Sequence, residues 1–397
     1  SPAERKQAGP RRRPTAHRAE RFFPRGGDSG LMRALYSLGV PLLAVVTALA
    51  LGAVLILATG GNVLLAYQGL WEGSLGRPQS ISETLVWATP YIFGGLAVAL
   101  AFKAGLFNIG VEGQIAVGSL ASVYVGYAVK GIPFPFHMLL AVAAGTLAGA
   151  IWGGIPGFLK ARTGAHEVIV TIMLNYVAIQ MTSFLVSGPM KDPNPLIANA
   201  QTPKILVSAR LPPLLPDPIY RVHWGFIVAL VAAAAIWWLL RNSTLGFEIR
   251  TIGANPQAAR YAGIAVGRTM VMAMALAGGL AGLGASLEVV GLNFYHTAGF
   301  SVGYGFDSIA VALLGRGDPI GVIPSALLFG ALRAGASRMQ FLSQIPIDII
   351  NVIQALVLIF VAAPALIRWL YRVRVPREAA SVTGEVQLTS GWGKAET

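Results

Sequence analysis

The chain has 397 residues, of which 55% are hydrophobic and only 12% are charged, and its net charge is +13. Soluble domains carry about twice that charged fraction, so the composition argues against an ordinary soluble domain. The 47 glycines suit closely packed transmembrane helices. The absence of cysteine excludes disulfides and cysteine metal sites, and five scattered histidines make a histidine cluster improbable.

The N-terminal segment, residues 1–33, is rich in Arg and Pro and has no apolar periodicity. It predicts a disordered basic arm. Apolar segments long enough to cross about 30 Å of hydrocarbon then recur along 34–370, and they predict an all-α polytopic membrane protein with about ten transmembrane helices. We place these helices near residues 33–58, 81–102, 107–129, 136–158, 167–187, 223–240, 268–290, 302–315, 319–337 and 346–370.

The connections between the predicted spans fix an orientation. If the chain starts inside the cell, roughly three quarters of the Lys and Arg residues fall on the cytoplasmic side, as the positive-inside rule requires. Residues 188–222 are then an external loop, 241–268 a cytoplasmic loop and 371–397 a cytoplasmic tail, so both termini are cytoplasmic. The basic charge is explained by this bias and by an arm that faces membrane lipid, and no nucleic acid polymer is expected as a partner.

A short sequence recurs in two of the predicted spans. Gly94–Ala97 and Gly278–Ala281 share the order Gly-Gly-Leu-Ala, and the two spans run in opposite directions in the predicted topology. An inverted internal repeat, common in transporters, explains this echo. Chance similarity between segments rich in Gly, Ala and Leu explains it equally well.

The loop 241–268 carries the clearest local signal. Asn255 is a good helix cap, Pro256 favours the first helical position and Gly263 favours a left-handed end. This pattern predicts a short helix that either lies on the membrane surface or projects as a docking element for a soluble partner. The docking candidates are Asn255, Pro256, Gln257, Ala258, Ala259, Arg260, Tyr261 and Gly263. Ala258 and Ala259 are small enough for a partner groove to close around them, and Arg260 offers a charged contact.

Polar residues inside the predicted spans are costly in lipid and usually face a cavity or a partner. Spacing predicts that Asn108 and Glu112 share one helical face, and that Asn351 and Gln354 share another. The candidates for a translocation path are Asn108, Glu112, Gln114, Asn175, Asn351 and Gln354. Structural pairing, such as Glu112 with Lys103 or with a backbone amide, is the alternative, because interhelical hydrogen bonds explain the same pattern.

Catalytic signatures are weak. The segment Gly315–Asp318 fits the GxGD pattern of intramembrane aspartyl proteases, but Asp307 and Asp318 fall at opposite ends of one short span. A two-carboxylate mechanism needs both groups at one point. Neither a Walker A motif nor an HExxH motif is present. We therefore expect a non-catalytic chain.

Three longer segments carry a family resemblance. They are Lys103–Gln114, Gly164–Tyr176 and Ser243–Ile264, with residues 251 and 252 outside the match. On these segments the chain resembles the permease subunits of bacterial ABC importers, in the branch for simple sugars, branched-chain amino acids and nucleosides. The likeness is greatest to nucleoside-uptake permeases and spans roughly residues 35–370.

The resemblance implies a complex in the bacterial inner or plasma membrane. Two permease chains, here expected to be non-identical, form the path, and an external substrate-binding lipoprotein delivers the cargo. A cytoplasmic ATPase subunit binds ATP and Mg, so this chain needs no cofactor. The resemblance also makes Asn255–Gly263 look like the coupling helix that seats in the ATPase.

Three alternatives stay open at the level of sequence. One is a permease for a simple sugar in the same transporter class. The second is an ion-coupled secondary transporter, which needs an ionisable residue near the middle of the membrane, with Glu112 and Asp348 as the best candidates. The third is a purely structural membrane scaffold.

Overall fold

The computed structural model describes residues 29–371, apart from 195, 197, 301–302, 347 and 363–369. Within these residues the chain forms helices, and its β-structure is limited to two isolated bridges, Gln201 with Thr297 and Pro213 with His223. This confirms the all-α prediction. The basic arm up to residue 28 and the tail from residue 372 lie outside the described residues.

Each of the ten predicted spans coincides with a helix, and six of these helices are long and apolar enough to cross a membrane, as judged over the described residues. The six are α3 (Pro78–Lys103), α5 (Phe136–Thr163), α6 (Glu167–Ser187), α7 (Gly225–Asn242), α10 (Val266–Glu288) and α12 (Pro319–Ser343). The other four are α1 (Ser29–Ala58), α4 (Val111–Ala128), α11 (Tyr304–Leu314) and α13 (Asp348–Ala362).

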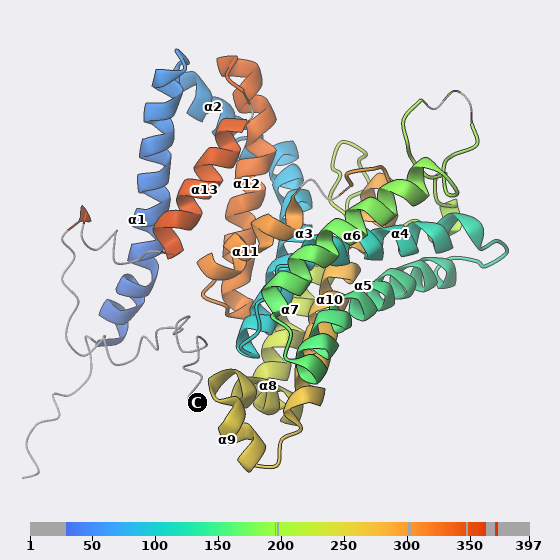
Figure 1. Ribbon diagram of the computed structural model, residues 1–397. Coiled ribbons are helices and arrows are strands. Elements are labelled where there is room, and N and C mark those ends of the chain that lie inside the picture. Colours follow the sequence, from blue (N-terminus) through green and yellow to red (C-terminus); the bar gives the residue numbers. More distant parts are fainter. Residues whose placement is uncertain are drawn as a thin grey trace, which may run out of the picture.

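The helix that follows α1 was not expected from the sequence. Helix α2 (Val63–Ser74) follows Asn62, whose side chain accepts hydrogen bonds from the backbone N–H groups of Leu64 and Leu65. It joins α1 to α3 at one end of the molecule (Figure 1) and packs against α12. The Asn62 cap was a usable signal. With 12 residues, α2 is too short to cross the hydrocarbon, so hydropathy alone does not indicate it.

Helices α3 and α10 form the centre of the molecule. Helices α1, α2, α12 and α13 gather on one side of them, and α4, α5 and α6 on the other (Figure 1). Most of α3 is buried, because residues on all its faces are small or apolar. The two Gly-Gly-Leu-Ala segments lie on these central helices. An inverted repeat that relates them stays a prediction.

Glycines bring the backbones of α5 and α10 into direct contact. A Cβ atom added to Gly149 would lie 2.8 Å from the Cα of Gly282, and one added to Gly153 would lie 2.8 Å from the Cα of Gly278. Gly145 faces the same seam and would meet the side chain of Ser286. Such small residues permit the close helix packing that stabilises proteins in lipid, where no hydrophobic effect drives helices together.

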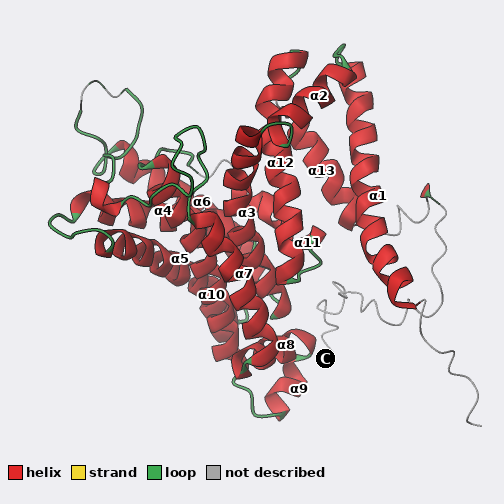
Figure 2. Cartoon of the chain, turned by 180° about the vertical axis from the view of Figure 1, so that it is seen from behind, coloured by secondary structure: helices red, strands yellow, loops and turns green. Residues whose placement is uncertain are grey.

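The two long connections lie at opposite ends of the molecule. The 188–222 segment lies at the end that carries α2, whereas α8 (Thr244–Ala254) and α9 (Pro256–Tyr261) lie at the other end (Figure 2). Residues 202–211 are tied by backbone hydrogen bonds to the chain after α10, for example from Ile205 to Phe294 at 2.8 Å. The 188–222 segment is thus anchored onto the end of α10.

A matched pair of substitutions tests the glycine seam. Gly278→Ala places a methyl group on the carbonyl oxygen of Gly149, and we expect it to destabilise the fold by at least ~1–3 kcal/mol. In Gly279→Ala the new methyl lies 3.5 Å from the Cβ of Ala150, an ordinary contact. Thermal unfolding of the purified protein in detergent should show a lower midpoint for Gly278→Ala alone. Equal unfolding midpoints for the two variants would contradict the close packing of α5 against α10.

Candidate functional site

The helix predicted in the loop 241–268 is present with the expected caps. The Asn255 side chain accepts hydrogen bonds from the backbone N–H groups of Gln257 and Ala258 at 2.9 and 3.0 Å, Pro256 is the first residue of α9, and Gly263 has φ +82°. A preceding helix, α8, was not expected. Its N-terminus is capped by Ser243, which accepts from the N–H of Gly246 at 3.0 Å. Together α8 and α9 project from one end of the molecule (Figure 1).

Exposure on α9 corrects one part of the prediction. Tyr261 is 93% exposed, and Gln257, Ala258 and Arg260 are also exposed, but Ala259 is completely buried in the apolar core. Ala259 is therefore not on a docking face. Its small side chain lets α9 lie close to the rest of the chain, so a bulky residue there would distort the helix before it affected any partner.

The polar residues around the start of α4 form a buried cluster of hydrogen bonds. Helix α4 begins at Val111, so Asn108 lies in the preceding loop and does not share a helical face with Glu112, contrary to the prediction. The amide groups of Asn108 and Gln114 exchange two hydrogen bonds of 3.1 and 3.0 Å. The Asn108 oxygen also accepts from the N–H of Gly110 at 3.0 Å. These bonds fix the start of α4.

Two further path candidates connect neighbouring helices. Asn175 of α6 accepts from the N–H of Gly113 at 2.9 Å and donates to the carbonyl of Ile109 at 2.8 Å. The carboxylate of Glu112 accepts from the N–H of Gly305, at the start of α11, at 2.7 Å. Glu112 thus bonds a backbone amide, which is one of the structural pairings that the sequence left open. For Asn108, Glu112, Gln114 and Asn175 the geometry favours a structural role.

The remaining candidates lie on α13 and differ from one another. Gln354 is buried, whereas Asn351 is exposed and accepts a hydrogen bond of 2.9 Å from Arg333 of α12. Arg333 also lies 3.6 Å from the carboxylate of Asp307 and donates to the hydroxyl of Tyr91 at 3.3 Å. This network joins α3, α11, α12 and α13, and no local sequence pattern indicates which of these residues pair.

Asp307 and Asp318 do not form the catalytic dyad that the GxGD protease pattern would require. Asp307 lies in the first turn of α11 and pairs with Arg333, whereas Asp318 caps α12 by accepting from the N–H of Gly321 at 3.3 Å. The two carboxylates lie at opposite ends of α11, so they do not share a proton or a water. Among the described residues, no group of three or more His, Asp or Glu side chains is placed to hold a metal ion.

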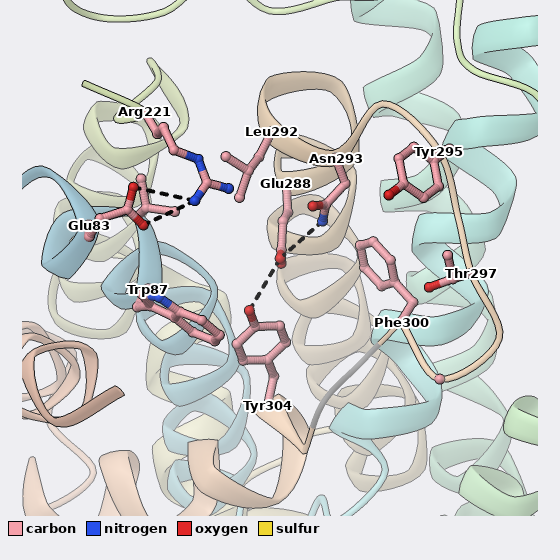
Figure 3. A pocket seen from close by; sticks show the side chains of 12 residues that line it. Glu83, Trp87, Arg221, Glu288, Leu292, Asn293, Tyr295, Thr297, Phe300 and Tyr304 are labelled. Atoms are coloured by element: carbon pink, nitrogen blue, oxygen red, sulfur yellow. Dashed lines mark hydrogen bonds and ion pairs between the residues drawn. The ribbon is translucent and has the colours of Figure 1, made fainter. Parts of the chain in front are cut away.

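A cavity of about 260 Å³ opens between α3, the end of α10, the start of α11 and the segment that connects α10 to α11. Aromatic rings and polar groups converge on it (Figure 3). Its lining residues are Glu83, Val86, Trp87, Arg221, Glu288, Leu292, Asn293, Tyr295, Thr297, Gly299, Phe300 and Tyr304.

The backbone geometry at the end of α10 positions the carboxylate of Glu288 in the cavity. After Glu288, α10 widens into a π-helical turn, Val289–Asn293, so residues five apart face each other. Asn293 donates to the Glu288 carboxylate at 3.3 Å, and the Tyr304 hydroxyl donates to the same oxygen at 3.3 Å. The other oxygen, Oε2, is buried without a hydrogen-bond partner. Glu288 is the one acidic residue in the span predicted at 268–290, a signal that was overlooked.

The charges around the cavity are largely balanced at its mouth. Arg221 lies 3.2 Å from the carboxylate of Glu83. His296 stacks on Phe300 at 4.9 Å, and burial lowers the pKa of His296 to about 4, so its ring is neutral at neutral pH. The cavity therefore combines a buried carboxylate with aromatic rings and no adjacent histidine charge.

A family model described as "Branched-chain amino acid transport system / permease component" matches residues 80–362. The chain belongs to this family. It is 43% identical to the guanosine ABC transporter permease protein NupP of Bacillus subtilis over 85% of this chain and 97% of the relative. It is 36% identical to the nucleoside ABC transporter permease protein NupB of Lactococcus lactis over 89% and 97%. Identity to the glucose ABC transporter permease protein TsgB13 of Haloferax volcanii is 35% over 89% and 94%. The protein is thus a multi-pass membrane permease.

Substitution of Asn175 tests the structural role of the buried hydrogen bonds around the start of α4. Asn175→Leu leaves the N–H of Gly113 and the carbonyl of Ile109 without partners, at a cost of ~1–3 kcal/mol each. We expect a lower unfolding temperature and a lower yield. Thr182→Val is the control on the same helix, because Thr182 bonds only within α6. A stable Asn175→Leu permease with impaired transport would restore Asn175 as a path residue.

Proposed function

We propose that the chain is the membrane-spanning permease subunit of an ABC importer for a nucleoside-like substrate. The observation that carries the proposal is the exposed α8–α9 projection, which lies at the opposite end of the molecule from the cavity and the 188–222 segment. Family membership and the similarity to ABC transporter permeases support it. They favour an ATP-driven importer over an ion-coupled secondary transporter.

The α8–α9 projection is the proposed coupling element. Tyr261 of α9 is 93% exposed and Phe247 of α8 is 56% exposed, so both aromatic side chains are accessible to a partner. A cytoplasmic ATPase subunit would cover this surface. That partner would bind ATP and Mg and carry out hydrolysis, and this chain would have no catalytic role.

The substrate assignment rests on the relatives. NupP and NupB are named for guanosine and nucleosides, and the matches cover 85% and 89% of this chain and 97% of each relative. TsgB13, named for glucose, has almost the same identity as NupB. A nucleoside is therefore the proposed substrate, and a simple sugar is the second candidate.

The polar face formed by α11, α12 and α13 supports a second permease chain as a partner. Asp348 and Asn351 are exposed on α13, and the Arg333–Asp307 ion pair lies beside them, only partly buried. Polar and charged groups that face the hydrocarbon of a membrane are costly. We infer that this face lines a path shared with a second, non-identical permease. An external substrate-binding lipoprotein would dock at the 188–222 end.

The proposed setting is a bacterial inner or plasma membrane, with both termini and α8–α9 in the cytoplasm. The chain has no cysteine, so single cysteines introduced at exposed positions report sidedness. We expect an impermeant maleimide to label Asn199→Cys in intact cells and to label Gln257→Cys only after the membrane is permeabilised. The reverse pattern would invert the topology and remove the docking assignment.

A substitution on the exposed face of α9 tests docking. We expect Tyr261→Ala to insert normally but to lose at least ~2 kcal/mol of binding energy to the ATPase, the size of a typical aromatic hot spot, which is roughly thirty-fold in affinity. Co-purification with the ATPase and ATP hydrolysis in proteoliposomes measure it. Tyr176→Ala, which removes an exposed tyrosine from α6, is the matched control. Wild-type co-purification and hydrolysis in Tyr261→Ala would refute the coupling assignment.

A further inference from the structure

We infer that the Glu288 cavity is a binding site for a neutral nucleoside, with the base against the aromatic rings and its N–H or O–H donors on the Glu288 carboxylate. The inference rests on the proposed function and adds to it a site within a single permease chain. None of the path candidates taken from the sequence lines this cavity.

The ring surfaces fit a flat heterocycle. Trp87 and Tyr304 meet with ring centroids 5.8 Å apart and their planes tilted by 54°, so together they form one concave wall. Phe300 and Tyr295 lie on the opposite side (Figure 3). Aromatic side chains bind bases through their π faces without regard to base identity. The walls therefore supply contact area, and the polar groups supply orientation.

The Glu288 carboxylate supplies the orienting acceptor. Asn293 and Tyr304 both donate to one oxygen, which fixes the carboxylate and leaves Oε2 without a partner. A buried acceptor without a partner is costly unless a ligand satisfies it. The arrangement thus selects a ligand that carries hydrogen-bond donors. Ribose hydroxyls and the N–H edge of a purine both qualify.

The lining of the cavity disfavours the anionic relatives of such a ligand. Its one basic side chain, the Arg221 guanidinium, is already paired with Glu83. A nucleotide would bury its phosphate here without a free cation to pair with it, which is costly. A neutral nucleoside carries no such group.

The location suits a site that receives substrate. The cavity lies beside residues 292–300, to which the 188–222 segment is hydrogen-bonded, and this is the end that the proposed topology turns outward. A nucleoside released from a binding protein would meet the cavity at the start of its passage. A site there needs only weak affinity, because the substrate must also leave it.

The test uses the complete transporter, with its ATPase and binding protein, in proteoliposomes. The probes are radiolabelled guanosine, with unlabelled guanosine 5′-monophosphate and glucose as competitors. Glu288→Gln keeps the shape of the side chain but replaces an acceptor oxygen with a donor NH₂ group. We expect at least a ten-fold loss of guanosine uptake at subsaturating concentration, with complex assembly retained. Neither competitor should reduce wild-type uptake.

Further variants separate a binding role from a folding role. Glu288→Asp keeps the acceptor and should recover part of the uptake, and Trp87→Phe should lose less uptake than Trp87→Leu. Trp238→Leu, which removes an exposed tryptophan from α7, is the control and should transport normally. Loss of assembly in Glu288→Gln, with no recovery in Glu288→Asp, would overturn the inference in favour of a purely structural carboxylate.

The outcomes also distinguish the inference from the proposed function. Normal guanosine uptake in Glu288→Gln would remove the site while leaving the nucleoside importer intact. Inhibition by guanosine 5′-monophosphate equal to that by unlabelled guanosine would overturn the charge argument. A wild-type complex that transports glucose but not guanosine would overturn the proposed substrate and the nucleoside site together.

Discussion

Close contact between the backbones of α5 and α10 is the constraint on which the rest of the structure depends. In lipid, helices gain little from burying apolar surface, so they associate through van der Waals contact and hydrogen bonds. Gly149 and Gly282 allow the two helices to meet along their length, and this holds α10 at the centre of the molecule. Because α10 is fixed there, both of its ends acquire defined positions.

Those two ends carry the two proposed functional features. Before α10, the chain forms the α8–α9 projection, with Tyr261 exposed for a partner. After α10, the π-helical turn brings Glu288 and Asn293 together at the floor of the cavity. In the proposed function, α10 connects the docking element to the substrate cavity. Movement of the ATPase would reach the cavity through two alternative arrangements of α10 that the partners bias.

Polar residues in membrane helices divide here into two groups. Asn175 and Glu112 bond backbone groups of neighbouring helices and thereby hold the loop before α4 and the start of α11 in place. In contrast, one carboxylate oxygen of Glu288 accepts no hydrogen bond, and Glu288 faces a cavity. Asn351 is exposed on an outer face. The distinction depends on whether the hydrogen-bonding capacity of the side chain is used within the chain, which a sequence pattern does not reveal.

The sequence by itself determined the class of fold, the approximate positions of ten apolar helices and the caps of α9, because each follows from local hydropathy or from side chains within a few residues of one another. Only the tertiary structure decided that Ala259 is buried, that Asn108 precedes its helix, and that Glu288, Trp87 and Tyr304 share a cavity. These facts depend on residues far apart in the chain. Their proximity is set by helix packing, and helix packing is not encoded in local periodicity.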